Sequence, residues 1–208
     1  MRSLFLALWL SLFSAVPAMA ATNISIGINL GAYPRLVAVP GYPVYYAPAV
    51  NSNYFFYDGL YWVLEGDRWY ASSWYNGPWH GVDPFSVPLY VLQVPVRYYR
   101  HPPAYFRGWH ANSAPRWNEH WGRDWESRRA GWNDRRGPRP SAAPLPTYQR
   151  QYSGNRYPQG EHQSALVGQN YRYQPREKVV QEHYQQQGVQ RQDRRGAENR
   201  GNERGRER

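Results

Sequence analysis

The chain has 208 residues, of which 17% are aromatic; its formal net charge is +10, its mean hydropathy is −0.84, and it contains no cysteine. This length suits one domain of ordinary size, and the low hydropathy excludes a multispanning membrane protein. The lack of cysteine excludes lipoprotein anchoring, disulfide frameworks, thiolate catalysis and cysteine-ligated zinc. The basic composition indicates anionic partners without specifying one.

Residues 1–20 have the features of a secretory signal peptide. Arg2 supplies a positive charge, residues 4–16 form a short apolar segment, and Ala18-Met19-Ala20 matches the small-x-small pattern of a cleavage site. The apolar segment is shorter than the roughly 20 residues of a spanning helix. We therefore expect cleavage near Ala21, an exported mature chain, and no transmembrane segment after cleavage.

Charge and composition divide the mature chain. From residue 21 to 96 two arginines face four acidic residues, a net charge of −2, whereas 22 basic and 11 acidic residues follow, a net charge of +11. All ten tryptophans lie at or before Trp132. Residues 137–208 are rich in Gln and Arg and poor in strong hydrophobes, so we predict that they form a disordered basic tail.

Residues 21–99 are predicted to form an aromatic-rich antiparallel β region. Residues 22–30 alternate apolar and polar side chains, which predicts a half-buried strand. Residues 34–48 contain four prolines, a density that favours extended, polyproline-like chain without ladder pairing. Residues 89–99 are expected to add a strand, with Pro95 at a sheet edge or at the end of the strand.

The clearest local structure is a meander of three or four strands between residues 53 and 82. Asp58-Gly59 is a dipeptide that two-residue type I′ hairpins prefer, and it separates two aromatic runs. Such a loop sets the register of four pairs: Tyr57 with Leu60, Phe56 with Tyr61, Phe55 with Trp62, and Tyr54 with Val63. Both resulting faces are apolar or aromatic, so neither is expected to face water.

The apolar period changes in residues 112–136, which we predict to form a Trp-rich amphipathic helix. Tryptophans recur there every four residues, at Trp117, Trp121 and Trp125. Ser113 is the expected N-cap. Two ion pairs at i,i+4 spacing would support the helix: Glu119 with Arg123, and Asp124 with Arg128. Because Gly122 costs about 1 kcal/mol inside a helix, the tryptophan face must be buried, and we expect it to pack on the meander.

These elements predict an α+β fold: a small antiparallel β-meander with one packed amphipathic helix, and a long disordered C-terminal tail. At most 116 residues then remain for a folded core. That length is enough for a small core but not for a large enzyme domain with a deep pocket.

Patterns for catalysis are absent from the sequence, which has no nucleotide-binding loop, no GxSxG elbow and no HExxH helix. Ser72, Ser73 and Ser86 lack a recognisable activating setting. The sheet region holds only four acidic residues for a carboxylate pair: Asp58, Glu65, Asp67 and Asp83. His120 and Asp124 could ligate a metal only weakly, because two mixed ligands do not close a site. We therefore predict no enzyme activity, no cofactor and no metal.

Two interpretations of the aromatic residues remain open. The simpler one is that they form the core of a small domain that lacks Leu and Ile. The alternative is an exposed platform that stacks on sugar rings. The candidate ligand-binding residues for that platform are Tyr61, Trp69, Tyr70, Trp74, Tyr75 and Trp79.

The basic tail also has two interpretations. Residues 191–208 carry seven arginines and four acidic residues, which is typical of a solvated polyampholyte. Weak binding to anionic envelope polymers or lipid headgroups is the alternative. Nucleic acid is not expected as a partner of an exported chain.

Several aromatic motifs resemble a group of uncharacterised exported proteins of Gram-negative proteobacteria. The resemblance spans roughly residues 35–158 and is carried by these segments: Val39 to Tyr46, Tyr54 to Trp62, Trp69 to Trp79, Val94 to Arg100, and the tryptophan helix. It implies a periplasmic or cell-envelope location, and it implies no activity, cofactor or site residue.

The sequence thus favours a non-enzymatic periplasmic or cell-envelope protein that contacts anionic envelope polymers through its basic tail. The alternative is a carbohydrate- or peptidoglycan-binding module that uses the Tyr/Trp face.

Overall fold

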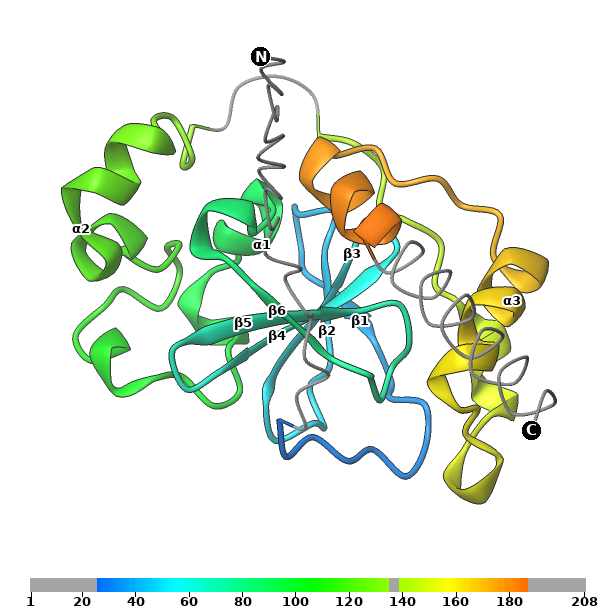
Figure 1. Cartoon of the computed structure of the whole chain (residues 1–208). Helices are drawn as coiled ribbons and strands as arrows, with labels where there is room; N and C mark the ends of the chain where they lie inside the picture. The colour runs from blue at the N-terminus through cyan, green and yellow to red at the C-terminus, as the bar shows by residue number, and fades with distance from the viewer. Residues whose placement is uncertain (1–25, 135–138, 187–208) are drawn as a thin grey trace, which may run out of the picture.

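The computed structural model describes residues 26–134 and 139–186, and an antiparallel sheet lies at its centre (Figure 1). Each of the six strands pairs with the next along the chain, so the sheet is a meander. The strands are β1 (Val37–Ala38), β2 (Tyr45–Tyr46), β3 (Asn53–Tyr57), β4 (Leu60–Glu65), β5 (Arg68–Ser72) and β6 (His80–Val82). The predicted signal peptide at residues 1–20 lies outside the described residues.

Helices follow and flank the sheet. The α-helices are α1 (Leu89–Leu92), α2 (Trp117–Arg128) and α3 (Gly160–Asn170), and residues 178–186 are also helical. The short 3₁₀ helices are η1 (Pro84–Ser86) before α1, η2 (Val96–Tyr98) and η3 (Ala104–Phe106) between α1 and α2, and η4 (Thr147–Gln151) and η5 (Gly154–Arg156) between α2 and α3. The predicted α+β class with an antiparallel sheet is confirmed. No helix in the described part of the chain is long and apolar enough to cross a membrane.

The hairpin between β3 and β4 has the predicted register at all four predicted pairs, from Tyr54 with Val63 to Tyr57 with Leu60. Asp58 and Gly59 have φ values of 49° and 91°. These left-handed conformations are those that a type I′ turn requires, and glycine adopts them without the strain that a Cβ causes.

The two predicted faces of this hairpin form separate cores. The first face consists of Phe55, Tyr57, Leu60, Trp62 and Leu64. The second face consists of Tyr54, Phe56, Tyr61 and Val63. All of these side chains are at least 95% buried, so the sheet has no wet face at its centre.

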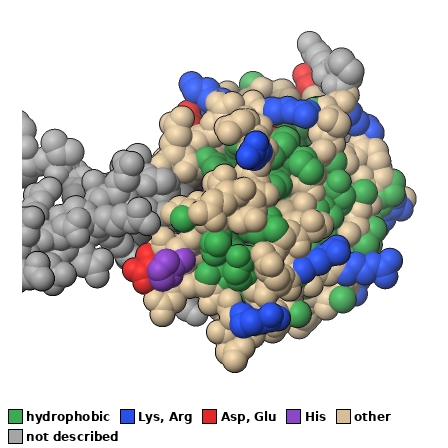
Figure 2. Space-filling model, turned by 90° about the vertical axis from the view of Figure 1, so that its right-hand side faces the viewer, with side chains coloured by type: hydrophobic (Ala, Val, Ile, Leu, Met, Phe, Trp, Pro, Cys, Tyr) green, Lys and Arg blue, Asp and Glu red, His purple; other side chains and the backbone are tan. Residues whose placement is uncertain are grey.

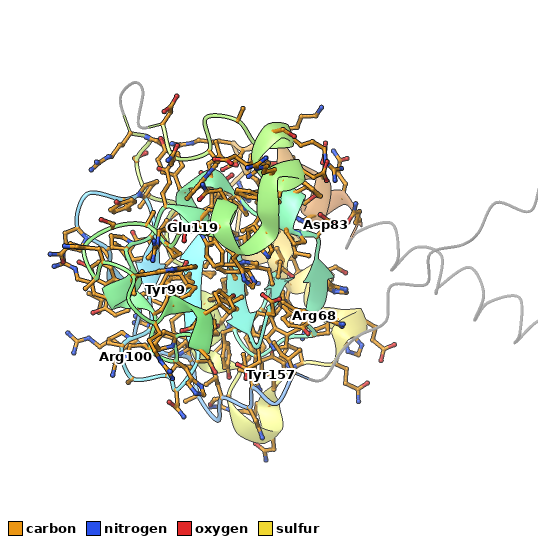
Figure 3. All side chains as sticks on the ribbon, turned by 90° about the vertical axis from the view of Figure 1, so that its left-hand side faces the viewer. Arg68, Asp83, Tyr99, Arg100, Glu119 and Tyr157 are labelled. Atoms are coloured by element: carbon orange, nitrogen blue, oxygen red, sulfur yellow. The ribbon has the colours of Figure 1, made fainter. Side chains whose placement is uncertain are left out.

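The first face is covered by the segment that contains α1 and α2, as predicted for the tryptophan helix. Trp117, Trp125 and Trp132 are buried in this core, and Trp117 donates its Nε1–H to the carbonyl oxygen of Leu92 at 2.9 Å. Tyr99 is also buried in this core, and Figure 3 shows this side of the molecule with Glu119 on α2.

Helix α2 departs from the prediction in its interior and at its start. Gly122 has a φ of 82°, which kinks the helix, and the N-cap is Arg116, not Ser113. The predicted pair of Asp124 with Arg128 forms, but Glu119 pairs with Arg116 in place of Arg123. The kink explains the second difference, because it breaks the i,i+4 geometry between residues on either side of Gly122.

Three predictions for the β region are wrong in detail. Residues 26–30 form no strand, although Ile26, Ile28 and Leu30 do pack against the second face. The proline-rich stretch contains β1 and β2, because both strands fall between prolines and escape their effect on the ladder. Residues 89–99 form α1 and η2 in place of a strand. The chain turns there because tertiary contacts hold it, including a hydrogen bond from the Leu89 N–H to Glu177.

The second face is covered by residues 139–173, which lie across the sheet from α2 (Figure 1). The prediction that disorder begins at residue 137 is therefore wrong for residues 139–186, and residues 187–208 lie outside the described part. The sequence argument counted aliphatic side chains, but this segment packs through tyrosine. Trp74 is fully buried beneath three of these rings, those of Tyr148, Tyr152 and Tyr157, with ring centroids 5.4 to 5.8 Å apart.

A buried glutamine links this segment to the sheet. Gln149 is fully buried, and its Oε1 accepts hydrogen bonds from the Tyr61 hydroxyl at 2.9 Å and the Tyr75 N–H at 3.2 Å. Its Nε2 donates to the Ser73 carbonyl oxygen at 2.9 Å and to the Tyr148 hydroxyl at 3.2 Å. The amide therefore satisfies polar groups that burial of the second face would otherwise leave unpaired.

Replacing Gln149 with leucine should lower the free energy of unfolding by about 3 kcal/mol or more, because several buried groups lose their partner at about 1–3 kcal/mol each. Gln151→Leu is the matched control in the same 3₁₀ helix, since Gln151 is exposed; it should change stability by less than about 0.5 kcal/mol. Urea unfolding measures both. Equal effects of the two substitutions would show that residues 139–186 do not pack on the sheet.

The turn glycines provide a second test of the packing. A Cβ at Gly59 would lie 3.1 Å from the Tyr184 hydroxyl and 3.2 Å from Tyr173 Cδ1, whereas a Cβ at Gly66 would have no neighbour within 4 Å. Gly66→Ala should therefore cost only the left-handed strain, about 1 kcal/mol, and Gly59→Ala about 2 kcal/mol or more. Urea unfolding of both variants checks this, and a larger cost at Gly66 would contradict it.

Candidate functional site

The predicted aromatic platform is not exposed. Its six residues are at most 7% exposed: Tyr61 0%, Trp69 1%, Tyr70 7%, Trp74 0%, Tyr75 0% and Trp79 3%. The hypothesis that they stack on a ligand is therefore wrong for the folded chain. The physical reason is that both faces of the sheet are covered, so these rings form the cores.

The other sequence candidates also have structural roles. Asp83 accepts a hydrogen bond from the Phe85 N–H and caps η1, and Asp67 bonds to His120 at 2.6 Å. The His120 ring stacks on Tyr105 with a centroid distance of 3.7 Å. Among the described residues, no group of three or more His, Asp or Glu side chains could hold a metal ion.

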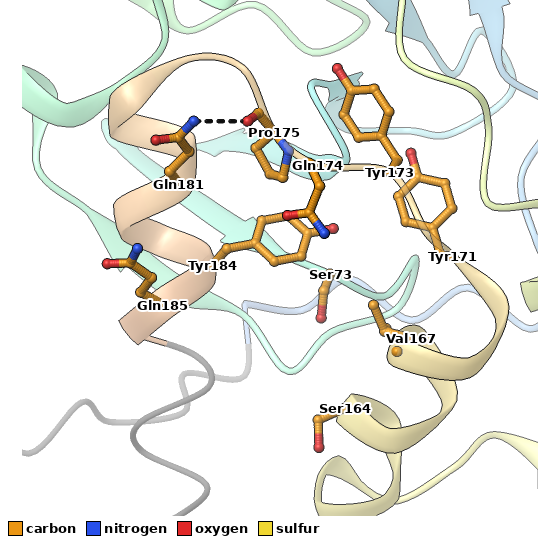
Figure 4. Close-up of a pocket in the computed structure, with 11 residues that line it drawn as sticks. Ser73, Ser164, Val167, Tyr171, Tyr173, Gln174, Pro175, Gln181, Tyr184 and Gln185 are labelled. Atoms are coloured by element: carbon orange, nitrogen blue, oxygen red, sulfur yellow. Dashed lines mark hydrogen bonds between the residues drawn. The ribbon is translucent and has the colours of Figure 1, made fainter.

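A pocket of about 440 Å³ lies between α3, the helical residues 178–186 and the end of β5. Its walls come from Ser73 and from four parts of the C-terminal segment: Ser164, Val167 and Gly168 on α3; Tyr171 and Tyr173 on the extended connection; Gln174 and Pro175 before the last helix; and Gln181, Tyr184 and Gln185 on it. Tyr171 and Tyr173 lie on one side of the pocket and Gln181 and Gln185 on the other (Figure 4).

The lining of this pocket carries no charged side chain. The tyrosine rings are held in place by their hydroxyls, which donate to the Pro144 carbonyl oxygen (Tyr171, 2.6 Å), to Asp58 (Tyr173, 2.6 Å) and to the Gly59 carbonyl oxygen (Tyr184, 2.9 Å). Burial raises the pKa of Tyr171 and Tyr173, so both remain neutral phenols. The pocket thus presents aromatic rings and neutral polar groups.

The polar groups of the lining differ in their hydrogen bonding within the described part of the chain. Gln181 donates to the Pro175 carbonyl oxygen at 2.9 Å. The amides of Gln174 and Gln185 and the hydroxyl of Ser164 make no side-chain hydrogen bond to other described residues. These amides and this hydroxyl can donate and accept hydrogen bonds with a bound molecule.

Asp58 holds the pocket wall in place from the hairpin turn. Its buried carboxylate accepts hydrogen bonds from the N–H groups of Arg176 and Glu177, each at 2.8 Å, as well as from the Tyr173 hydroxyl. These N–H groups directly precede the helical residues 178–186, so Asp58 caps that helix across more than 100 residues of sequence.

Glu177 makes the complementary contacts to the sheet. Its carboxylate accepts hydrogen bonds from the Tyr57 hydroxyl at 2.9 Å and from the Leu89 N–H at 3.1 Å. Burial raises the pKa of this carboxyl above its ordinary value, although these hydrogen bonds and the nearby Arg129 oppose the shift. Asp58 and Glu177 together fix the last helix against β3, β4 and α1.

Sequence reasoning missed nearly all of this pocket. Ser73 is the only one of its lining residues that the sequence marked as a candidate, and it was considered there as a nucleophile. The signal in the C-terminal segment was weak: Tyr171 and Tyr173 alternate along extended chain, and Val180 and Tyr184 have helical spacing. Neither pattern specifies which part of the sheet the segment contacts.

Comparisons with protein-family models, with curated proteins and with solved structures find no significant match to this chain. The resemblance to exported proteobacterial proteins therefore stays a prediction.

The raised pKa of Glu177 predicts how stability depends on pH. Folding favours the protonated carboxyl, so its contribution is present below the ordinary pKa of 4.5 and is lost as pH rises through the raised value. The stability of the wild type should therefore increase relative to Glu177→Gln as pH falls from 7 toward 4.5. Urea unfolding across this range measures the difference, and parallel curves for the two proteins would contradict the assignment.

Proposed function

We propose that this protein is a non-enzymatic binding protein of the cell envelope whose pocket holds an uncharged mono- or disaccharide unit of a glycan. The observation that carries this proposal is the lining of the pocket, which combines tyrosine rings with neutral amides and hydroxyls. Sugar rings present apolar faces that stack on aromatic rings, and their hydroxyls both donate and accept hydrogen bonds.

Size and shape support a small polar ligand. The volume of about 440 Å³ lies within the roughly 300–1,000 Å³ range of small-molecule sites. The walls are fixed by Asp58 and Glu177, so ligand binding need not pay for ordering them. A charged ligand would find no counter-ion in the lining.

A binding role is favoured over catalysis because the lining has no carboxylate, histidine or lysine that could transfer a proton. The envelope location is proposed from the signal-peptide pattern at residues 1–20. The proposed glycan site is thus the pocket and not the buried aromatic residues of the sheet.

Calorimetric titration with neutral oligomers of N-acetylglucosamine tests this proposal. Gln174→Ala and Gln185→Ala should each weaken binding about two- to tenfold, as expected for loss of one hydrogen bond of roughly 0.5–1.5 kcal/mol. Gln169→Ala is the matched control, because Gln169 is exposed on α3 and lies outside the pocket lining. Equal affinity of all three variants for the oligomers would show that the ligand binds elsewhere. Absence of binding of neutral oligosaccharides at millimolar concentration would refute the proposal.

A further inference from the structure

The segment that covers the second face is strongly basic together with the three residues that follow it. Residues 139–176 contain five arginines and a single acidic residue, Glu161. All five arginine side chains are exposed: Arg139, Arg150, Arg156, Arg172 and Arg176. We call these five residues the arginine face. Figure 2 shows this side of the molecule, with basic side chains spread across it and acidic side chains toward its edges.

Two arginines on the opposite side of the molecule have acidic partners. On and beside α2, Arg116 pairs with Glu119 and Arg128 pairs with Asp124. No arginine of the arginine face forms an ion pair with any residue that the structure describes. Unpaired charge on folded chain is repulsive within the protein and available to an external anion.

Three of these guanidinium groups are held on tyrosine rings. Arg139 lies 5.3 Å from the ring centroid of Tyr42, Arg150 lies 5.6 Å from that of Tyr33, and Arg176 lies 5.8 Å from that of Tyr173. Such cation–π contacts restrict the side chain while leaving its N–H groups able to donate. Restricted guanidinium groups lose less conformational entropy when they bind an anion.

We infer that the arginine face binds an extended acidic polysaccharide, with individual guanidinium groups paired to its carboxylates or phosphates. Planar guanidinium groups match such oxyanions in a bidentate manner. The arginines are distributed over several parts of the segment, which suits a polymer with repeated charges better than one small anion. The choice of a polysaccharide over a lipid surface rests on the proposed saccharide pocket, because the same segment contributes to both sites. The inference that the partner is anionic does not depend on that pocket.

The anion-binding arginines proposed here lie in the folded segment 139–176, whereas the sequence predicted anion contacts by a disordered tail. The sequence predicted that residues 137–208 contact anionic polymers as a disordered segment. In the structure, five arginines of residues 137–208 belong to the ordered segment 139–176, which packs on the sheet, and their side chains are exposed. The remaining arginines at 191–208 lie outside the described residues, so the experiment has to separate the two sets.

The test measures binding of full-length mature protein to polygalacturonate, a carboxylated polysaccharide, with neutral dextran as the reference polymer. Three triple variants remove equal charge from three places. They are R150Q/R156Q/R172Q on the arginine face, R116Q/R123Q/R128Q on α2, and R200Q/R204Q/R206Q near the C-terminus. A fourth variant, R150K/R156K/R172K, keeps the charge, and circular dichroism and urea unfolding check that each variant is folded.

The arginine-face glutamine variant should bind polygalacturonate about tenfold more weakly, as expected for three exposed ion pairs, and its affinity should depend less on salt. The lysine variant should retain most of the affinity, and the other two variants should lose less than about threefold. Dextran should not bind through this face.

Three outcomes would overturn the inference. Equal loss in the C-terminal variant would assign the contact to residues 191–208, and equal loss in the α2 variant would show an unspecific charge effect. Binding to phosphatidylglycerol vesicles that depends on the arginine face, without binding to polygalacturonate, would assign the surface to a membrane. Failure of the neutral-oligosaccharide titration alone would refute the pocket and leave the arginine-dependent binding of polygalacturonate intact.

Discussion

The structure depends on one constraint, which is that the central strands have two apolar faces. Five consecutive residues of β4, from Leu60 to Leu64, are fully buried, so alternate side chains point into two different cores. A sheet of this kind in water needs cover on both faces. The α2 segment provides one layer and residues 139–173 provide the other.

Covering the second face with a polar segment buries polar groups, several of which find hydrogen-bond partners, whereas Gln163 Oε1 and Trp79 Nε1 find none in the described part of the chain. Gln149 and Gln163 are at most 1% exposed, and both donate to carbonyl oxygens of the turn that follows β5. Asp58 and Glu177 perform the same function for the last helix. A segment of average hydrophobicity too low for an independent fold is thus ordered by tyrosine packing and by hydrogen bonds to a rigid sheet.

This arrangement separates the core residues from the proposed binding residues. Most of the described tryptophans and the tyrosines of β3, β4 and β5 are core residues, although their number suggested a binding surface. The pocket and the arginine face both lie on the covering segment, which uses the sheet as a support. Binding residues on irregular segments held by a regular scaffold are common, because loops can vary in sequence without loss of the core.

Some local features of this protein were predictable from sequence alone. The Asp58-Gly59 turn, the register of β3 with β4, the two faces and the burial of the α2 tryptophans all follow from turn stereochemistry and periodicity over a few residues. The order of residues 139–186 and the position of the pocket follow from long-range contacts. Those outcomes depend on hydrogen bonds between residues 88 to 119 positions apart, such as Tyr61 with Gln149 and Asp58 with Glu177. Local composition does not predict such contacts, because neither residue of a pair indicates from its own sequence neighbourhood which distant residue it will bond to.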